Sequence, residues 1–371
     1  MSKSIGSVAL ERRVDALFSR YTRPGSPGAV AAVMRGSEIE LCKGYGLASI
    51  ELGVPIGPKT RFRIASVSKQ FTVSAALMLA EEGKLKLSDP PHKYLSELKP
   101  LPVTIDQMMR NASGLPDFLE LLRLGGHSLD KPARLEDLLA ACVRNNHLNF
   151  APGSRFLYSN SNFLLLGLII EKLTGNSVEQ EFQRRIFTPL GLRNTHLPPR
   201  TSNALPAPYP NGYQFGTNVE TMATQVLSLD QQAAARAGIL KPLDATHDNP
   251  SWGWTAGSGI STAEDLARYA HALVGGGLLN DAMQKQRLAS IRPINPADPK
   301  SPGYGLALAQ FGPVFGHTGE LPGYNSFMGH DPRRRITIVV WSSLAAAPDG
   351  RAPAVEMAKA IIGHLYGGQI P

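Results

Sequence analysis

The sequence lacks several features that mark large classes of protein. It contains only two cysteines in 371 residues, Cys42 and Cys142, which sit beside apolar residues and have neither C-x-x-C nor zinc-type spacing. This pattern predicts two buried free thiols. The nine histidines are scattered along the chain, which excludes a zinc hydrolase built on clustered histidines, and we expect no metal ion and no cofactor. A G-x-S-x-G motif is also absent, which excludes an α/β-hydrolase.

Long hydrophobic runs are missing too. The longest apolar run covers residues 163–170 and is too short to cross a membrane. The N-terminal residues contain neither the sustained apolar segment nor the cleavage site of a secretion signal. We therefore expect a cytoplasmic protein that makes no membrane contact, unless a signal sequence has been removed.

The positive charge is spread along the chain rather than concentrated. The net charge is +8, yet the one basic run, residues 333–335, follows Asp331 and Pro332 between two strand-like segments. A solvated hairpin turn explains this run better than a nucleic-acid site, so we expect no nucleic-acid partner. The basic surface could still steer anionic substrates toward the protein.

Strand-like and helix-like patterns follow one another in an order typical of an α+β protein. Runs of β-forming residues occur near both ends of the chain, at residues 29–34, 38–45, 305–309, 314–317, 324–329 and 336–342. Helical patterns cover residues 5–20, residues 352–366 and most of residues 85–191. We predict an antiparallel sheet flanked by the N- and C-terminal helices, plus a mostly helical lobe.

The same patterns predict two lobes. Residues 1–85 and 256–371 would form a discontinuous α/β lobe around the sheet, and residues 86–255 would form the helical lobe. Within the helical lobe, residues 196–252 are rich in Pro, Asn, Gly and Thr and show no steady periodicity. We call this segment the excursion. Long irregular segments often line binding clefts, so we expect a site between the lobes that the excursion borders.

Ser66 and Lys69 form an S-x-x-K motif at the start of an apolar run with helical spacing that ends at Gly83. Because residues three apart on a helix share a face, the Lys69 amine can point at the Ser66 hydroxyl. The positive end of the helix favours an oxyanion and disfavours an ammonium, so the lysine pKa should be lowered. Ser66 would then be a nucleophile with an adjacent base. Two other S-x-x-K matches exist, but in both the lysine precedes a proline, a position biased away from helix.

Two further motifs indicate catalysis only when they are considered together with the S-x-x-K motif. Tyr158 and Asn160 form Y-x-N, where the tyrosine could be a partly buried residue with a satisfied hydroxyl or a phenol that accepts and returns a proton. His317, Thr318 and Gly319 form H-T-G on a strand-like run, where the histidine could be structural or catalytic. Glycine within a strand lets another backbone approach closely, as a substrate lying along the edge would.

In this order, S-x-x-K, Y-x-N and H-T-G are similar to the motif set of the serine penicillin-recognising superfamily. The chain resembles the branch that holds class C β-lactamases, DD-peptidases and D-aminopeptidases or D-amino-acid amidases, over roughly residues 25–345. Ser113-Gly-Leu-Pro-Asp-Phe118 and residues 186–192 look similar too. The absence of Ser-Asp-Asn excludes the class A plan.

The resemblance implies a role for each motif residue in acyl transfer. Ser66 would be the nucleophile, Lys69 its neighbouring base and Tyr158 the relay of protons to the leaving group. The backbone N–H groups of Ser66 and Glu320 would form the oxyanion hole, which is usually the largest contribution to acyl transfer.

The resemblance also implies contacts around the substrate. Asn160 would hydrogen-bond the acyl chain, Thr318 would contact the substrate, and His317 would help hold Tyr158 in its charged form. If so, activity should fall as His317 loses its proton. Further candidates for the substrate-binding surface are Gly319, Phe118, Trp252 and Glu120, and Trp254 is a second tryptophan that could line the cleft.

Departures from the family pattern narrow the expected substrate. In DD-carboxypeptidases of this branch an arginine before the K/H-T-G strand grips a terminal carboxylate, and residues 304–310 here contain none. Asp117, Glu120 and Glu320 could instead hold a substrate ammonium. We therefore favour hydrolysis of D-amino-acid amides, esters or short peptides with D-residues, through an acyl-enzyme that β-lactams would also form.

Three alternatives stay open from the sequence. A broad carboxylesterase would use the same motifs, as would a class C-like β-lactamase or DD-carboxypeptidase, which differ in how fast water attacks the acyl-enzyme. A non-catalytic penicillin-binding sensor is a further alternative of a different class. The sequence predicts no oligomeric state.

Overall fold

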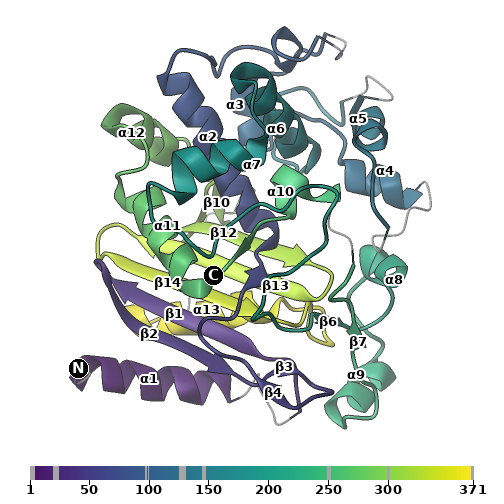
Figure 1. The fold of residues 1–371 in the computed structure, drawn as a ribbon, viewed down its shortest axis with the longest axis vertical. Coiled ribbons are helices and arrows are strands. Elements are labelled where there is room, and N and C mark those ends of the chain that lie inside the picture. The colour runs from purple at the N-terminus through teal and green to yellow at the C-terminus, as the bar shows by residue number, and fades with distance from the viewer. Residues whose placement is uncertain are drawn as a thin grey trace.

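The computed structural model describes residues 5–19, 25–96, 98, 100–124, 131–143, 148–248, 252–298 and 301–368 (Figure 1). An eight-stranded antiparallel sheet dominates one half of the molecule, in the order β2-β1-β14-β13-β12-β11-β10-β9. Its strands are β1 (Ala29–Arg35), β2 (Glu38–Tyr45), β9 (Arg292–Pro293), β10 (Gly303–Tyr304), β11 (Ala309–Phe311), β12 (Val314–Leu321), β13 (Tyr324–Asp331) and β14 (Ile336–Ser342).

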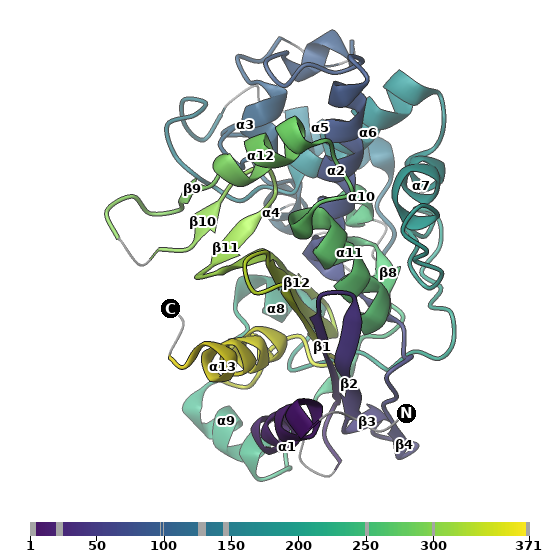
Figure 2. The same cartoon turned by 90° about the vertical axis from the view of Figure 1, so that its left-hand side faces the viewer.

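Both faces of the sheet are covered by helices. Figure 2 shows α1 (Ile5–Phe18) and α13 (Pro353–Tyr366) on one face and α11 (Ala263–Gly275) on the other. Side chains of a strand alternate between faces, so Ala31 and Val33 join the core under the terminal helices, while Val30 and Ala32 join the larger core on the opposite face. The predicted α+β fold, an antiparallel sheet flanked by the terminal helices, is confirmed.

A group of helices forms the other half of the molecule. They are α2 (Ser68–Glu81), α3 (Ile105–Met109), α4 (Phe118–Leu124), α5 (Leu135–Val143), α6 (Ser161–Thr174), α7 (Val178–Phe182), α10 (Trp254–Gly257) and α12 (Asp281–Ala289), with short 3-10 turns at η1 (Ala65–Val67) and η2 (Pro91–Lys93) and a π-helical turn at η3 (Gln183–Phe187). The two helices α2 and α6 are buried on nearly all sides because each is packed into the core. In both views α2 rises from the sheet into the group of helices (Figure 1, Figure 2).

The apolar run at residues 305–309 does not form the predicted strand. Leu306 and Leu308 are fully buried, so the run is apolar because it fills the core rather than because it pairs in a ladder. Ala307 lies between them with a φ of +52°, and its N–H donates to the Met109 carbonyl at 2.8 Å. Strand β12 in turn extends four residues beyond the predicted end at His317.

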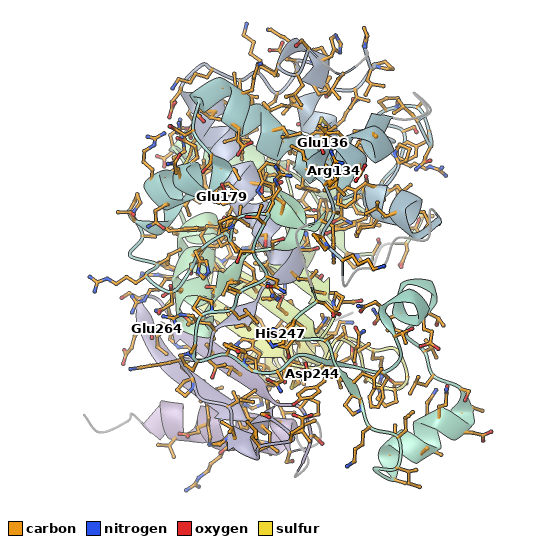
Figure 3. All side chains as sticks on the ribbon, turned by 45° about the vertical axis from the view of Figure 1, so that its right-hand side comes forward. Arg134, Glu136, Glu179, Asp244, His247 and Glu264 are labelled. Atoms are coloured by element: carbon orange, nitrogen blue, oxygen red, sulfur yellow. The ribbon has the colours of Figure 1, made fainter. Side chains whose placement is uncertain are left out.

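The excursion holds short elements within an otherwise irregular path. These are β6 (Tyr213–Gln214), α8 (Asn218–Ala223), α9 (Leu229–Arg236) and β7 (Leu243–Asp244). Strand β6 pairs with β7, and Asp244 and His247 lie on the part of the excursion that crosses in front of the sheet (Figure 3). The remaining strands are β3 (Leu47–Ser49), β4 (Val54–Pro55), β5 (Phe62–Arg63) and β8 (Ile260–Ser261).

In the part of the chain that the structure describes, three features are absent: a membrane-spanning helix, a group of metal-binding side chains and a disulfide. This part contains no helix that is both long and apolar enough to span a bilayer. No group of three or more His, Cys, Asp or Glu side chains in it could hold a metal ion. Both cysteines are free thiols, and Cys142 is buried as predicted, whereas Cys42 is only partly buried.

Candidate active site

Ser66 lies in the short 3-10 turn η1 that joins β5 to α2, two residues before the α-helix begins. The preceding residue, Ala65, has a φ of +53°, a left-handed conformation that a residue with a Cβ rarely adopts. Hydrogen bonds on both sides hold this segment: the Ile64 N–H donates to the Gly259 carbonyl at 2.9 Å, and the Ser326 hydroxyl donates to the Ile64 carbonyl at 2.8 Å. The surrounding backbone therefore fixes the position of the Ser66 side chain.

Lys69 is fully buried directly beside Ser66. Its amine lies 2.9 Å from Ser66 Oγ, 2.8 Å from Asn160 Oδ1 and 2.6 Å from the Ala256 carbonyl oxygen. Burial lowers the pKa of Lys69 to about 7, against an opposing effect of Asp117. The amide and carbonyl oxygens can only accept, so they take the two N–H bonds of the neutral amine and leave its lone pair for the Ser66 hydroxyl.

The orientation of Asn160 depends on Asp117. Asn160 Nδ2 donates to Asp117 Oδ2 at 2.9 Å, so the amide oxygen must face Lys69. Asp117 is itself held by the Leu119 N–H at 3.0 Å from Oδ1, and desolvation raises the pKa of this carboxyl group. Asn160, predicted to contact the acyl chain, is therefore also part of the bonding that orients the base.

Tyr158 brings a free hydroxyl to the same place. Lys69 Nζ lies 4.9 Å from the centroid of the Tyr158 ring. The Tyr158 hydroxyl is buried and has no hydrogen-bond partner among the residues that the structure describes. Desolvation raises the pKa of Tyr158, although the nearby Ser66 hydroxyl acts in the opposite direction, so the phenol is neutral. A buried hydroxyl without a partner is costly unless a ligand completes it.

His317 lies at the site, but its charge differs from the prediction. The centroids of the His317 and Tyr158 rings are 6.3 Å apart. Burial, together with the nearby Lys69, lowers the pKa of His317 to about 3. The imidazole is therefore neutral from pH 5 to 9, and the prediction that activity falls as His317 loses its proton is corrected. A neutral ring cannot hold Tyr158 in its charged form by charge attraction.

Gly319 allows the H-T-G strand to lie against the nucleophile. Strand β11 pairs with β12 only as far as Gly316, so beyond that point this edge of β12 faces η1. A Cβ at Gly319 would come within 2.3 Å of the Ile64 carbonyl oxygen and 3.0 Å of Ala65 Cβ. The backbone of Ile64 thus approaches Gly319 closely, a contact that the sequence did not predict, and the approach of a substrate along this strand stays a prediction.

A cavity of about 510 Å³ opens in front of Ser66. The predicted site residues that line it are Ser66, Tyr158, Asn160, His317, Thr318, Gly319, Glu320, Glu120 and Trp252. The excursion contributes Gln214, Thr221, Gln225 and Trp252 to the lining of this cavity. Phe118 does not line the cavity, because its side chain is fully buried in the core. Trp254 is also a core residue, and its indole N–H donates to Glu179 Oε1 at 3.0 Å.

A match across most of the sequence agrees with this geometry. Residues 14–361 match the protein family described as Beta-lactamase. The chain belongs to the Beta-lactamase family. D-aminopeptidases are among the curated relatives of this chain.

Three proteins show what this member of the Beta-lactamase family is similar to in sequence and in fold. A D-aminopeptidase from Cereibacter sphaeroides is 29% identical over 362 residues, which cover 96% of this chain but only 63% of that protein. A D-stereospecific amidohydrolase from Streptomyces sp. is 25% identical with a TM-score of 0.75, over 96% of this chain and 97% of the other. The D-amino acid amidase from Ochrobactrum anthropi SV3, complexed with L-phenylalanine amide, shares the fold with a TM-score of 0.79 at 22% identity, over 98% and 99%.

Sequence reasoning missed several partners of the catalytic groups. The Ala256 carbonyl and the Ser326 hydroxyl could not be found from the sequence, because neither belongs to a motif and a carbonyl carries no side-chain signal. Asp117 was noted only as a possible ammonium ligand, whereas it holds Asn160. The backbone oxyanion hole of Ser66 and Glu320 stays a prediction.

The close approach at Gly319 generates the first prediction. In Gly319→Ala the new methyl group collides with Ile64, so β12 or η1 must shift. A displacement of about 1 Å at Ser66 should lower kcat about 100-fold, and overpacking should reduce the free energy of unfolding by about 1–3 kcal/mol. Ester hydrolysis and urea unfolding measure the two effects.

Gly57→Ala is the matched control for Gly319→Ala, because the nearest atom to its new methyl group would be 3.9 Å away. This control should leave both quantities unchanged. Wild-type activity in Gly319→Ala would show that the strand does not need this contact.

The surroundings of Lys69 generate the second prediction. If the neutral amine is the base, the acylation rate should rise with pH around an apparent pKa of about 7, the pKa to which burial lowers Lys69. The rise should persist in His317→Asn, because the histidine is neutral throughout this range. Burst kinetics with p-nitrophenyl butyrate from pH 5 to 9 measure the rise. A flat wild-type profile, or a rise that vanishes in His317→Asn alone, would contradict the assignment.

Proposed function

We propose that the protein hydrolyses amides, esters or short peptides of D-amino acids through an acyl-enzyme on Ser66. The arrangement of the Lys69 amine carries this proposal. With its two N–H bonds directed at Asn160 and Ala256, the amine can accept the Ser66 proton as Oγ attacks a carbonyl carbon. Negative charge then develops on the substrate oxygen, which the predicted oxyanion hole would stabilise.

Tyr158 can complete the proton transfer to the leaving group. Its hydroxyl gives a proton to the departing amine or alkoxide and receives the proton held by Lys69, so that the phenol and the amine end the step neutral. Water then attacks the acyl-enzyme by the reverse route, and the acid is released from Ser66. The buried, unpartnered state of the Tyr158 hydroxyl supports this role.

The charge of the cavity supports a cationic substrate. Three of its described lining residues are acidic, Asp117, Glu120 and Glu320, and none is lysine or arginine. A DD-carboxypeptidase or a β-lactamase binds a substrate carboxylate, for which a cationic side chain would be the usual partner. The names of the D-aminopeptidase and amidohydrolase relatives support the same preference.

Glu320 is the carboxylate best placed for a substrate ammonium. Asp117 is already held by the Asn160 amide and the Leu119 N–H. Glu320 lies two residues after Thr318 on β12, so both side chains point to the cavity side of the strand. Its carboxylate accepts a hydrogen bond from Gln225 of the excursion. A free α-ammonium next to the scissile carbonyl would add a charge-assisted hydrogen bond there.

A substrate panel tests the proposed function. D-Alanine p-nitroanilide should be hydrolysed at least about tenfold faster than the L-isomer, which requires a difference of about 1.4 kcal/mol in transition-state binding. The comparison uses kcat/KM, with Ser66→Ala as the inactive control. Turnover of p-nitrophenyl butyrate alone would favour a carboxylesterase, and rapid turnover of a chromogenic cephalosporin would favour a β-lactamase. Stable labelling by penicillin without turnover would favour the sensor.

Substitution of Glu320 tests the proposed recognition of the ammonium. Glu320→Gln should raise KM for D-alanine p-nitroanilide about tenfold or more, because a hydrogen bond to a charged group contributes about 1.5–3 kcal/mol. The N-acetylated substrate, which has no ammonium, should be unaffected. Glu264→Gln is the control, because Glu264 lies on α11 in an exposed pair with Arg268 (Figure 3). Equal effects on both substrates would exclude Glu320 as the ammonium ligand, and an effect of Glu120→Gln alone would transfer that role to Glu120.

A further inference from the structure

Tyr304 is a buried tyrosine whose hydroxyl contacts the active-site histidine. It ends strand β10 and is only 7% exposed. Its hydroxyl oxygen lies 3.2 Å from His317 Nε2, and the two ring planes are nearly perpendicular, at 75°. Phe156 packs against the other side of the tyrosine, with ring centroids 5.1 Å apart. The neighbouring residues attracted notice in the sequence only because they lack an arginine.

The second ring nitrogen of His317 decides the direction of these hydrogen bonds. His317 Nδ1 lies 2.5 Å from the Thr318 carbonyl oxygen, which can only accept, so Nδ1 carries the proton. Since burial keeps the ring neutral, Nε2 must then be an acceptor. The Tyr304 hydroxyl therefore donates to Nε2. With the proton on Nε2, the ring could still donate to the Tyr304 oxygen but would lose the bond to the Thr318 carbonyl, so only the Nδ1 tautomer satisfies both contacts.

Burial favours the neutral forms of this pair, and the neighbouring charged and titratable groups modify that effect. Burial lowers the pKa of His317, and Lys69 on α2 acts in the same direction. Desolvation and the nearby Tyr158 raise the pKa of Tyr304, whereas Arg287 opposes the rise. Asn111 has a buried amide nitrogen without a partner among the described residues, and this amide partly offsets the rise in the Tyr304 pKa. A proton donor near the tyrosine oxygen leaves the Tyr304 hydrogen free for His317.

We propose that Tyr304 is a positioning residue, which locks His317 as a neutral ring protonated on Nδ1 and thereby holds the Thr318 carbonyl at the edge of β12. Thr318 is followed by Gly319, which lies against the backbone before Ser66. The hydrogen bonds from Tyr304 to His317 and from His317 to Thr318 therefore hold the segment of β12 that contains Thr318 and Glu320 and passes the nucleophile. His317 acts here through hydrogen bonds and shape, without a positive charge.

Removal of the Tyr304 hydroxyl should change the tautomer or the ring orientation of His317 while the protein stays folded. In Tyr304→Phe, Nε2 becomes a buried acceptor without a donor, which favours the other tautomer or a rotated ring. Either change breaks the bond to the Thr318 carbonyl. We expect kcat for p-nitrophenyl butyrate to fall about tenfold, the effect of a lost buried hydrogen bond, while KM changes less than about twofold.

The tautomer can be measured directly by ¹⁵N NMR of histidine-labelled protein, with His317→Asn used to assign the signals. In the wild type, His317 should show a protonated Nδ1 and an unprotonated Nε2, with no titration from pH 5 to 9. Tyr304→Phe should shift Nε2 toward the protonated form or show averaged signals. The matched control is Tyr269→Phe, another fully buried tyrosine, whose hydroxyl lies 3.1 Å from Ser74 Oγ, and it should leave the His317 signals and kcat unchanged.

The NMR measurement tests the role of Tyr304 without any substrate. Only the kcat measurement rests on the proposed function. A wild-type His317 that titrates between pH 5 and 9, or that is protonated on Nε2, would overturn this role of Tyr304 even if Tyr304→Phe failed to fold. Unchanged signals and unchanged kcat in a folded Tyr304→Phe would overturn it as well. Absence of a D-substrate preference would contradict the function and leave the NMR result standing.

Discussion

A buried amine whose three hydrogen-bond contacts with described residues are all to oxygen atoms is the constraint on which the site depends. Lys69 has lost its water shell, so its charged form is disfavoured and its pKa falls to about 7. The one carboxylate that opposes this shift, Asp117, acts across Asn160, which bonds to both groups. The amine is therefore close enough to a negative charge to be tolerated in the core, yet among the described residues it has no direct ion-pair partner that would keep it protonated.

The fold delivers this arrangement by bringing distant segments to one point. Asn160 and Ala256 lie 91 and 187 residues after Lys69. Asn160 directly precedes α6 and Ala256 lies within the short helix α10, and both helices pack against α2. Close packing of these helices requires a small residue, because a Cβ at Gly167 of α6 would lie 2.6 Å from the Thr255 side chain of α10. The position of the base is thus a property of the whole helical core, and small shifts in that core would reach it.

The sequence predicted the elements whose signal is local and missed those whose signal depends on the tertiary environment. Strands β13 and β14 and the terminal helices follow from periodicity, which sets the buried faces before any tertiary contact forms. Residues 305–308 broke this rule because a buried loop is as apolar as a strand. In the same way, Phe118 stands beside a motif, and nothing in the sequence distinguishes a cavity wall from the core.

The residue types of the site were likewise predictable, whereas their charges were not. Ser66, Lys69, Tyr158 and His317 were all found from motif order, and the structure brings their side chains to one place. The charge on His317 depends on burial and on the distance to Lys69, neither of which can be deduced from a triplet of letters. A family motif therefore transfers positions more safely than it transfers protonation states.

The charge of the whole protein differs from the charge of its cavity, and this difference bears on the proposed substrate. The net charge is +8, but the described cavity lining holds three carboxylates and no lysine or arginine. Lys69 and His317 do not correct this imbalance, since burial lowers both pKa values to about 7 and about 3. A lysine in place of His317 would bring a compact ammonium that favours a substrate carboxylate. The neutral imidazole removes that attraction, and the acidic lining supports the proposed preference for a substrate with a free ammonium.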